Sequence, residues 1–182
     1  MINDKMAKAL NKQINAELYS AYLYNAMTAY FAALNLEGFV TWMKVQSMEE
    51  LYHAMKIYNF MLDRGGRVVL EAIDKPKTEW KSPLNAFQEA NKHEQLITSM
   101  INDLVSLSLE LKDHATNAML QWFVTEQVEE ELNTDNVVQR LKLVGGSGEG
   151  LLRVDQELAA RAFTIPPDVR MVVNPAAAGA AP

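Results

Sequence analysis

Residues 49–55 read EELYHAM, and within this stretch Glu50 and His53 stand three positions apart. In a helix, residues at positions i and i+3 lie on one face, so these two side chains project together. The rest of that helical stripe is mostly apolar, with Phe39, Met43, Ile57 and Phe60. A carboxylate and an imidazole within an apolar stripe predict a buried polar site, and the rest of the sequence is interpreted around it.

Long segments rich in Ala, Leu, Met, Glu, Gln and Lys surround this stretch, and these residues favour helix. Glycine, proline and asparagine separate the segments. We predict helices over 4–34, 37–64, 83–111 and 114–143, and a shorter one over 149–162. Ser82 followed by Pro83 is a typical helix start, with Ser as the N-cap and Pro in the first turn. No segment is typical of a strand.

The lengths of the connections predict the topology. Short links join the first two helices and the next two, so each pair is expected to form an antiparallel hairpin. The link over 65–82 is long: some 18 residues span up to about 59 Å, more than the roughly 42 Å of a 28-residue helix. We therefore predict an all-α four-helix bundle with one long crossover and a short fifth helix. Residues 1–165 would form this domain and 166–182 a flexible tail.

The composition narrows the class of protein. The chain has 182 residues, of which 49% are hydrophobic and 22% charged, so neither disorder nor a coiled-coil rod is expected. The absence of cysteine excludes disulfides, cysteine-ligated metal sites and thiol nucleophiles. A net charge of −6 argues against nucleic acid as a partner. No leader or membrane-spanning run is evident, which predicts a soluble cytoplasmic protein.

Each of the four predicted long helices has a polar interruption near the middle of its apolar stripe. The interruptions are Glu17, Glu50 with His53, Glu94, and Gln127 with Glu130. Packed side by side, they would meet at one level, where unpaired carboxylates cost several kcal/mol each. Two divalent cations would neutralise four carboxylates, and oxygen ligands with one imidazole suit iron or manganese. Glu50 and Glu130 are the natural candidates to bridge the two ions.

The chain resembles prokaryotic non-haem ferritins over residues 1–165. The matching segments are NAELYSAYLY at 15–24, EELYHAM at 49–55, KHE at 92–94 and FVTEQVEEE at 123–131. The resemblance implies the known ferritin-like di-iron fold. It also implies a first iron position at Glu17, Glu50 and His53, and a second at Glu50, Glu94 and Glu130 beside Gln127. A third iron position would use Glu49, Glu126, Glu129 and Glu130.

The function implied by the resemblance is iron storage with ferroxidase activity. Ferrous ions would be oxidised with oxygen or peroxide and stored as ferric mineral inside a shell of 24 identical subunits, with the fifth helix at the four-fold axes. Tyr24, Glu17, Glu50 and His53 would be the catalytic group. Haem is not expected, because Tyr52 stands where the related bacterioferritins have a methionine ligand. Met48 and Met55 would instead pack at a subunit contact.

Several alternatives stay open at this stage. Tyr24 would either serve the site as an electron or hydrogen-bond donor or be an ordinary core residue, and we expect Trp122 mainly to pack. Glu49, Glu126 and Glu129 would otherwise form a solvated face. His93 and His114 are interpreted as surface or interface residues. The rival functions are a small di-iron enzyme without storage and a shell that protects DNA.

Overall fold

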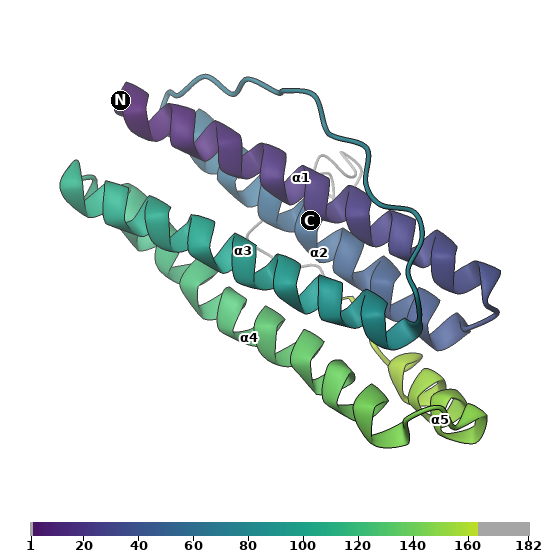
Figure 1. Cartoon of the computed structure of the whole chain (residues 1–182). Helices are drawn as coiled ribbons and strands as arrows, with labels where there is room; N and C mark the ends of the chain where they lie inside the picture. The colour runs from purple at the N-terminus through teal and green to yellow at the C-terminus, as the bar shows by residue number, and fades with distance from the viewer. Residues whose placement is uncertain (1, 164–182) are drawn as a thin grey trace, which may run out of the picture.

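The computed structural model describes residues 2–163, which form five helices (Figure 1). These are α1 (Asp4–Ala33), α2 (Glu37–Asp63), α3 (Pro83–Glu110), α4 (His114–Val144) and α5 (Gly148–Leu158). The four long helices begin and end within one residue of the predicted positions, and the described part contains no strand. The tail predicted over 166–182 lies outside the described residues. None of the described helices is both long and apolar enough to cross a membrane.

Helices α1 and α2 form one antiparallel pair, and α3 and α4 form the other (Figure 1). Local signals explain where the helices start and turn. Ser82 accepts a hydrogen bond from the backbone N–H of Asn85 at 3.1 Å, as the Ser-Pro signal predicted. Asn35 has a positive φ of 56° in the α1–α2 turn, a conformation that its short polar side chain tolerates.

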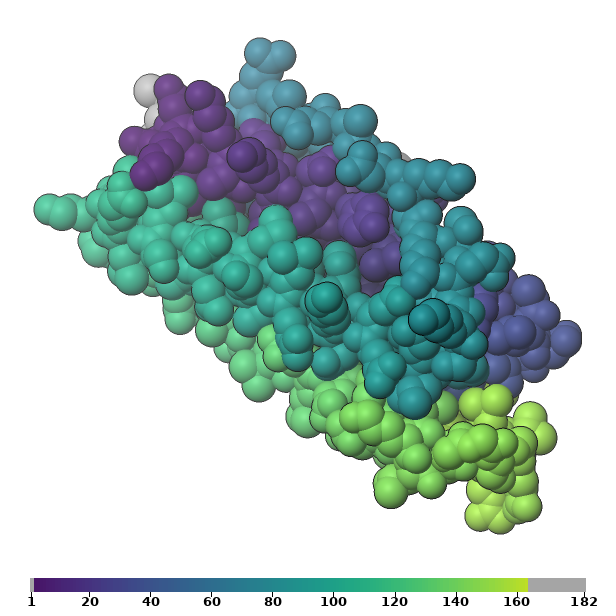
Figure 2. Space-filling view, in the orientation of Figure 1, coloured from purple at the N-terminus to yellow at the C-terminus, as the bar shows by residue number. Residues whose placement is uncertain are grey.

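The segment between α2 and α3 crosses the length of the bundle on the outside of α1 (Figures 1 and 2). Two asparagines of α1 hold it there. The Asn11 side chain donates to the carbonyl of Arg67 at 3.1 Å and accepts from the N–H of Val69 at 2.8 Å. The Asn15 side chain donates to the carbonyl of Ala72 at 3.1 Å. Helices α2 and α3 are therefore parallel, and the predicted crossover is confirmed.

The core consists of two apolar clusters with a polar layer between them. One cluster, towards α5, contains the stacked and edge-on rings of Phe31, Phe39, Trp42 and Phe87. The other, towards the far end of the bundle, contains Met6, Leu10, Ile57, Ile101 and Phe123. Burial of each such side chain stabilises the fold by about 1.5–3 kcal/mol. The bundle is thus held at both ends by ordinary hydrophobic packing, which leaves the middle available for polar groups.

Helix α5 is shorter than predicted, since it ends at Leu158 instead of continuing to 162. The backbone tightens after it, with N–H groups of residues 160 and 161 bonding to carbonyls three positions back. Val154 and Leu158 bury the apolar side of α5. The carboxylate of Asp155 accepts from the backbone N–H groups of Gly38 and Phe39 at 2.8 and 3.0 Å. Asp155 therefore caps α2, whose own cap residue makes no side-chain bond.

Substitution of Gly38 by alanine tests this contact. Alanine normally favours a helix over glycine by about 1 kcal/mol. Here, however, a Cβ at position 38 would lie 1.6 Å from the backbone carbonyl oxygen of Asp155, so α5 would have to move. We expect Gly38→Ala to lower the thermal midpoint of unfolding. Gly148→Ala is the matched control because its Cβ meets nothing within 4 Å, and it should hold or raise the midpoint. Equal midpoints in both variants would contradict this account of α5.

Candidate metal centre

The first part of the polar layer joins α1 to α2. Ligand atoms of Glu17, Glu50 and His53 lie within 4.8 Å of one another, and all three side chains are buried. His53 Nδ1 is 3.4 Å from Glu50 Oε2. The imidazole ring is fixed by edge-on packing against Trp122 and Phe123, with ring centroids 5.4 and 5.9 Å away. The structure thus brings together the three residues predicted for the first metal position.

The second part of the layer comes from α4. Glu126 and Glu130 form a group with His53 in which the ligand atoms again lie within 4.8 Å of one another. Glu130 is buried, whereas Glu126 is half-buried and places Oε1 3.8 Å from His53 Nε2. His53 therefore lies between two carboxylate groups, one from α1 and α2 and the other from α4.

Glu94 enters the same layer from α3 and is fully buried. The Tyr24 hydroxyl donates a hydrogen bond to Glu94 Oε1. Gln127, predicted beside the second metal position, donates its amide to the carbonyl of Glu94 and to Thr98 Oγ1, both at 3.3 Å. Gln127 therefore orients the α3 backbone. Tyr24 touches a predicted ligand, which favours the hydrogen-bonding interpretation over that of an ordinary core residue.

Two buried glutamines organise the carboxylates. Gln13 Nε2 donates to Glu17 Oε1 at 2.9 Å. Gln46 Nε2 donates to Glu50 Oε1 at 3.2 Å and to Glu130 Oε2 at 2.7 Å, so one amide links α2 to α4. Each glutamine stands four residues before a glutamate on its own helix, and this i, i+4 spacing is a signal that the sequence offered. Gln13 and Gln46 were not among the predicted site residues.

Burial and mutual repulsion shift the pKa values of the glutamates. Burial, followed by the charge of Glu50, raises the pKa of Glu17 to about 8, and the same causes raise that of Glu130 to about 8. Burial and the charges of Glu50 and Glu130 raise the pKa of Glu94 well above its usual range. Without cations, these three carboxyls hold protons at neutral pH.

Glu50 and His53 shift in the directions expected of an ion pair. Burial opposes ionisation of Glu50, but the hydrogen bond and charge of His53 outweigh it and lower the carboxyl pKa. Burial likewise opposes the charged imidazole, but hydrogen bonds to Glu126 and Glu50 raise the His53 pKa well above its usual value. A bound metal needs these ligands deprotonated, so metal binding would release protons.

The donor set fits hard metal cations. Among the described residues, Oε2 of Glu17 and Oε2 of Glu94 are buried without a hydrogen-bond partner. A buried acceptor left unpaired costs about 1–3 kcal/mol, so a native fold rarely leaves two together. Both oxygens belong to residues that the sequence predicted as ligands. Carboxylate oxygens with a single imidazole match the preference of iron or manganese.

Two residues predicted for the third metal position lie outside both groups. Glu49 is half-buried and forms an ion pair with Arg161, and Glu129 is exposed. Arg161 was not predicted as a site residue, because its partners Gln46 and Glu49 are more than 100 residues away in the sequence. The third position stays a prediction, with Glu126 and Glu130 the two members that the structure places together.

His93 was predicted as a surface or interface residue, and a place at an interface stays a prediction. It is half-buried beside the site: its Nε2 is 2.7 Å from Ser20 Oγ, and its ring lies 6.3 Å from that of Tyr24. Burial lowers its pKa. His93 directly precedes Glu94 on α3, and its side chain also faces α1. His114 is exposed, as predicted.

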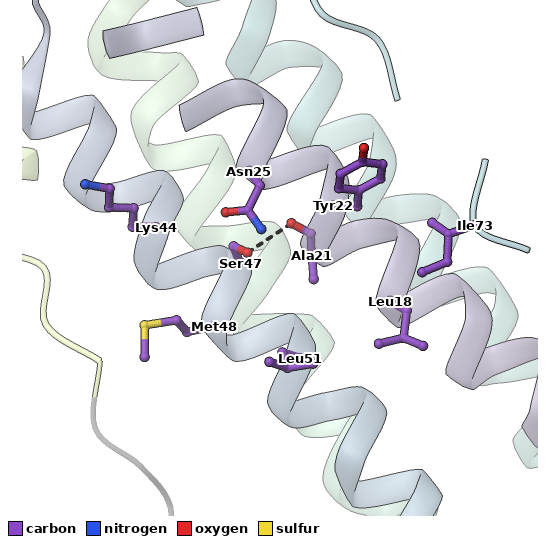
Figure 3. A pocket seen from close by; sticks show the side chains of 9 residues that line it. All are labelled: Leu18, Ala21, Tyr22, Asn25, Lys44, Ser47, Met48, Leu51 and Ile73. Atoms are coloured by element: carbon purple, nitrogen blue, oxygen red, sulfur yellow. Dashed lines mark hydrogen bonds between the residues drawn. The ribbon is translucent and has the colours of Figure 1, made fainter. Parts of the chain in front are cut away.

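An apolar pocket lies on α1 and α2, and Ile73 of the crossover segment also lines it (Figure 3). Met48 is exposed there, beside Tyr22, Leu51 and Ile73. Tyr52 instead points inward, with its ring 5.8 Å from that of Trp122. The position of Met48 suits the predicted subunit contact. That haem is not bound stays a prediction.

Comparison with known proteins identifies the family of the chain. The model of the ferritin-like domain family matches residues 7–144, which includes every predicted metal ligand. The chain belongs to this family. The ferritin resemblance and the fold predicted from the sequence are thereby confirmed.

Bacterial non-heme ferritins are among the relatives of this ferritin-like chain. One from Escherichia coli is 37% identical over 159 residues, covering 87% of this chain and 96% of the relative. One from Staphylococcus saprophyticus is 39% identical, covering 90% and 98%. A closed form of the Archaeoglobus fulgidus ferritin, engineered by site-directed mutagenesis, is 50% identical with a TM-score of 0.89, covering 90% of this chain and all of the other.

The raised carboxyl pKa values predict how the metal-free protein responds to pH. A carboxyl whose pKa is higher in the folded state stabilises the fold below its unfolded value of 4.5, and this contribution is lost as pH rises through about 8. We expect the free energy of unfolding to fall between pH 6 and 8.5, by up to about 1.4 kcal/mol per pH unit for each such group. Urea unfolding in a chelator measures this.

The matched control is Glu17→Gln, which removes one titrating group while keeping the hydrogen-bonding shape. In this variant, the free energy of unfolding should fall less steeply over the same pH range. The lowered pKa of Glu50 acts only at more acidic pH, so it does not disturb this window. A stability that is constant or rises from pH 6 to 8.5 in the parent would show that the carboxyls are not protonated in the metal-free fold.

Proposed function

We propose that this chain is an iron-storage ferritin that oxidises Fe(II) at a two-metal site within each subunit and stores the Fe(III) product inside a protein shell. Membership of the ferritin-like family supports iron storage with ferroxidase activity. One observation carries the assignment to these residues. Buried glutamates from all four long helices are close enough to repel one another, three of them interact with His53, and two of their oxygens have no partner.

In this proposal, Glu17, Glu50 and His53 hold the first ferrous ion. Glu50, Glu94 and Glu130 hold the second, so Glu50 bridges the two. Glu94 offers its unpartnered Oε2, while Tyr24 occupies Oε1. Gln46 keeps the carboxylates of Glu50 and Glu130 aimed at the same space by donating to both.

The chemistry follows from the charges of this ligand set. Each ferrous substrate ion gives up one electron, and O₂ with two protons takes the two electrons from one pair of ions to become hydrogen peroxide. Hydrogen peroxide with two further protons takes two electrons from a second pair of ferrous ions and becomes two waters. Anionic oxygen ligands stabilise the ferric product more than the ferrous substrate, which favours oxidation. Tyr24 donates its hydroxyl hydrogen bond beside the second position and keeps Glu94 in place.

A third, weaker cation position at Glu49, Glu126, Glu129 and Glu130 is part of the proposal. Its support is the group that Glu126 and Glu130 form with His53. Glu49 and Glu129 line a neighbouring surface recess that is open to solvent. Like charges so close together on α4 are unfavourable without a cation.

We further propose assembly into a homo-oligomeric shell, with 24 subunits as the expected number. The exposed apolar side chains on the α1–α2 face suit contact with a second copy (Figure 3). Structural relatives include an open pore ferritin from Archaeoglobus fulgidus. A cytoplasmic location stays a prediction from the sequence. The rival small di-iron enzyme would not form a shell and would retain only about two irons per chain.

Substitution of Glu50 by glutamine tests the proposed function. Glu50 would contact both ions, so its loss should slow the rapid oxidation of the first two Fe(II) per subunit by more than about 100-fold, beyond the loss typical of residues that only support ligands. Stopped-flow absorbance after aerobic mixing measures the rate. Gel filtration with iron counting shows whether the parent forms a shell that retains more than two irons per chain.

Glu131→Gln is the matched control. Glu131 neighbours Glu130 on α4 and is half-buried, but it accepts from Thr98 Oγ1 at 2.5 Å and belongs to neither carboxylate group. The Glu131→Gln variant should oxidise iron at the parental rate. Rapid oxidation by Glu50→Gln would refute the proposed site, and a small parent particle holding two irons would favour the enzyme alternative.

A further inference from the structure

Arg161 connects the end of α5 to the metal centre. It stands three residues beyond Leu158, and its side chain is 17% exposed. The guanidinium lies over the indole of Trp42, with its carbon 4.2 Å from the ring centroid. This stacking holds a cation against α2 on the side where Glu49 is placed.

The two ends of the guanidinium contact different residues. Nη1 donates to Gln46 Oε1 at 2.8 Å, and Nη2 donates to Glu49 Oε2. Arginine has donors only, so the Gln46 oxygen must face Arg161. The Gln46 amide nitrogen then faces the opposite way, toward Glu50 and Glu130. Arg161 is therefore linked through Gln46 to two carboxylates of the centre, those of Glu50 and Glu130.

Glu49 thus has its cation already. The guanidinium and a metal ion would both need the carboxylate of Glu49. Bound to the same group, the two positive charges would lie close together and repel each other. Arg161 also has somewhere to go, because it lines a surface recess with Glu129, Asn133, Arg140 and Glu157. A swing of its side chain into that recess would expose Glu49 without moving the α2 backbone.

We propose that Arg161 is a built-in cation at Glu49, which a third divalent ion must displace before it can bind. The inference rests on the proposed function, because it assigns the factor that keeps the third position weaker than the first two. It also couples that position to α5, since Arg161 follows α5 directly and α5 is docked on α2 through Asp155.

The test compares zinc binding by isothermal titration calorimetry in the metal-free parent and in Arg161→Met. Methionine retains an unbranched side chain over Trp42 but has no charge and no donor. We expect two tight zinc ions per subunit in both proteins. The third should bind about tenfold more tightly in the variant, because a charge-assisted hydrogen bond no longer has to be broken.

Three further variants separate the inference from simpler effects. Arg140→Met removes an equal charge from the same recess, where Arg140 pairs with the exposed Glu157, and should leave the third affinity unchanged. Arg161→Lys keeps the charge but cannot hold Gln46 and Glu49 together, so it should tighten the third ion by about threefold. In the double variant Arg161→Met, Glu49→Gln, the gain in affinity for the third zinc ion should disappear.

An unchanged or weaker third affinity in Arg161→Met would overturn the inference while leaving the two-metal site intact. If that variant does not fold, Arg161→Lys decides by the same criterion. An equal gain in Arg140→Met would also overturn the inference, because it would show a general effect of charge. Absence of tight zinc binding in the parent would instead refute the proposed function.

Discussion

Repulsion among buried carboxylates is the constraint on which the rest of this structure depends. Four glutamates, one from each long helix, reach the same layer of the core. The metal-free fold tolerates them because protons replace cations: burial and neighbouring charge raise the pKa values of Glu17, Glu94 and Glu130. His53 supplies a positive charge, and two glutamines supply donors. The unpartnered oxygens of Glu17 and Glu94 show that these substitutes are incomplete.

The architecture around the layer serves to hold those carboxylates together. Apolar clusters on both sides supply the stability that the polar layer does not. The long crossover, held by Asn11 and Asn15, makes α2 and α3 parallel and so brings Glu94 to the level of Glu50. Helix α5 caps α2 through Asp155 and carries the chain to Arg161. The fifth helix is therefore joined to the metal centre as well as to the end of the bundle.

Much of this was predictable because helical periodicity is local. The helix ends follow caps and turn residues such as Ser82 and Asn35, and the stripes placed Glu17, Glu50, Glu94 and Glu130 on inward faces. What the sequence did not show depended on contacts between distant segments. The inward turn of His93 depends on Ser20 and Tyr24 of α1, and the early end of α5 precedes the reach of Arg161 toward Glu49. Both features depend on residues far apart in the chain, so no repeating spacing in the sequence reveals them.

The most direct test of the account is the stability of the parent protein with and without a redox-inert divalent cation. If cations complete the layer, saturating zinc should raise the free energy of unfolding by about 2.7 kcal/mol at a hundredfold excess over Kd. Zinc should also remove most of the fall in stability from pH 6 to 8.5, because bound metal replaces the protons. A urea midpoint that zinc leaves unchanged across this range would contradict the claim that these carboxylates form a metal centre.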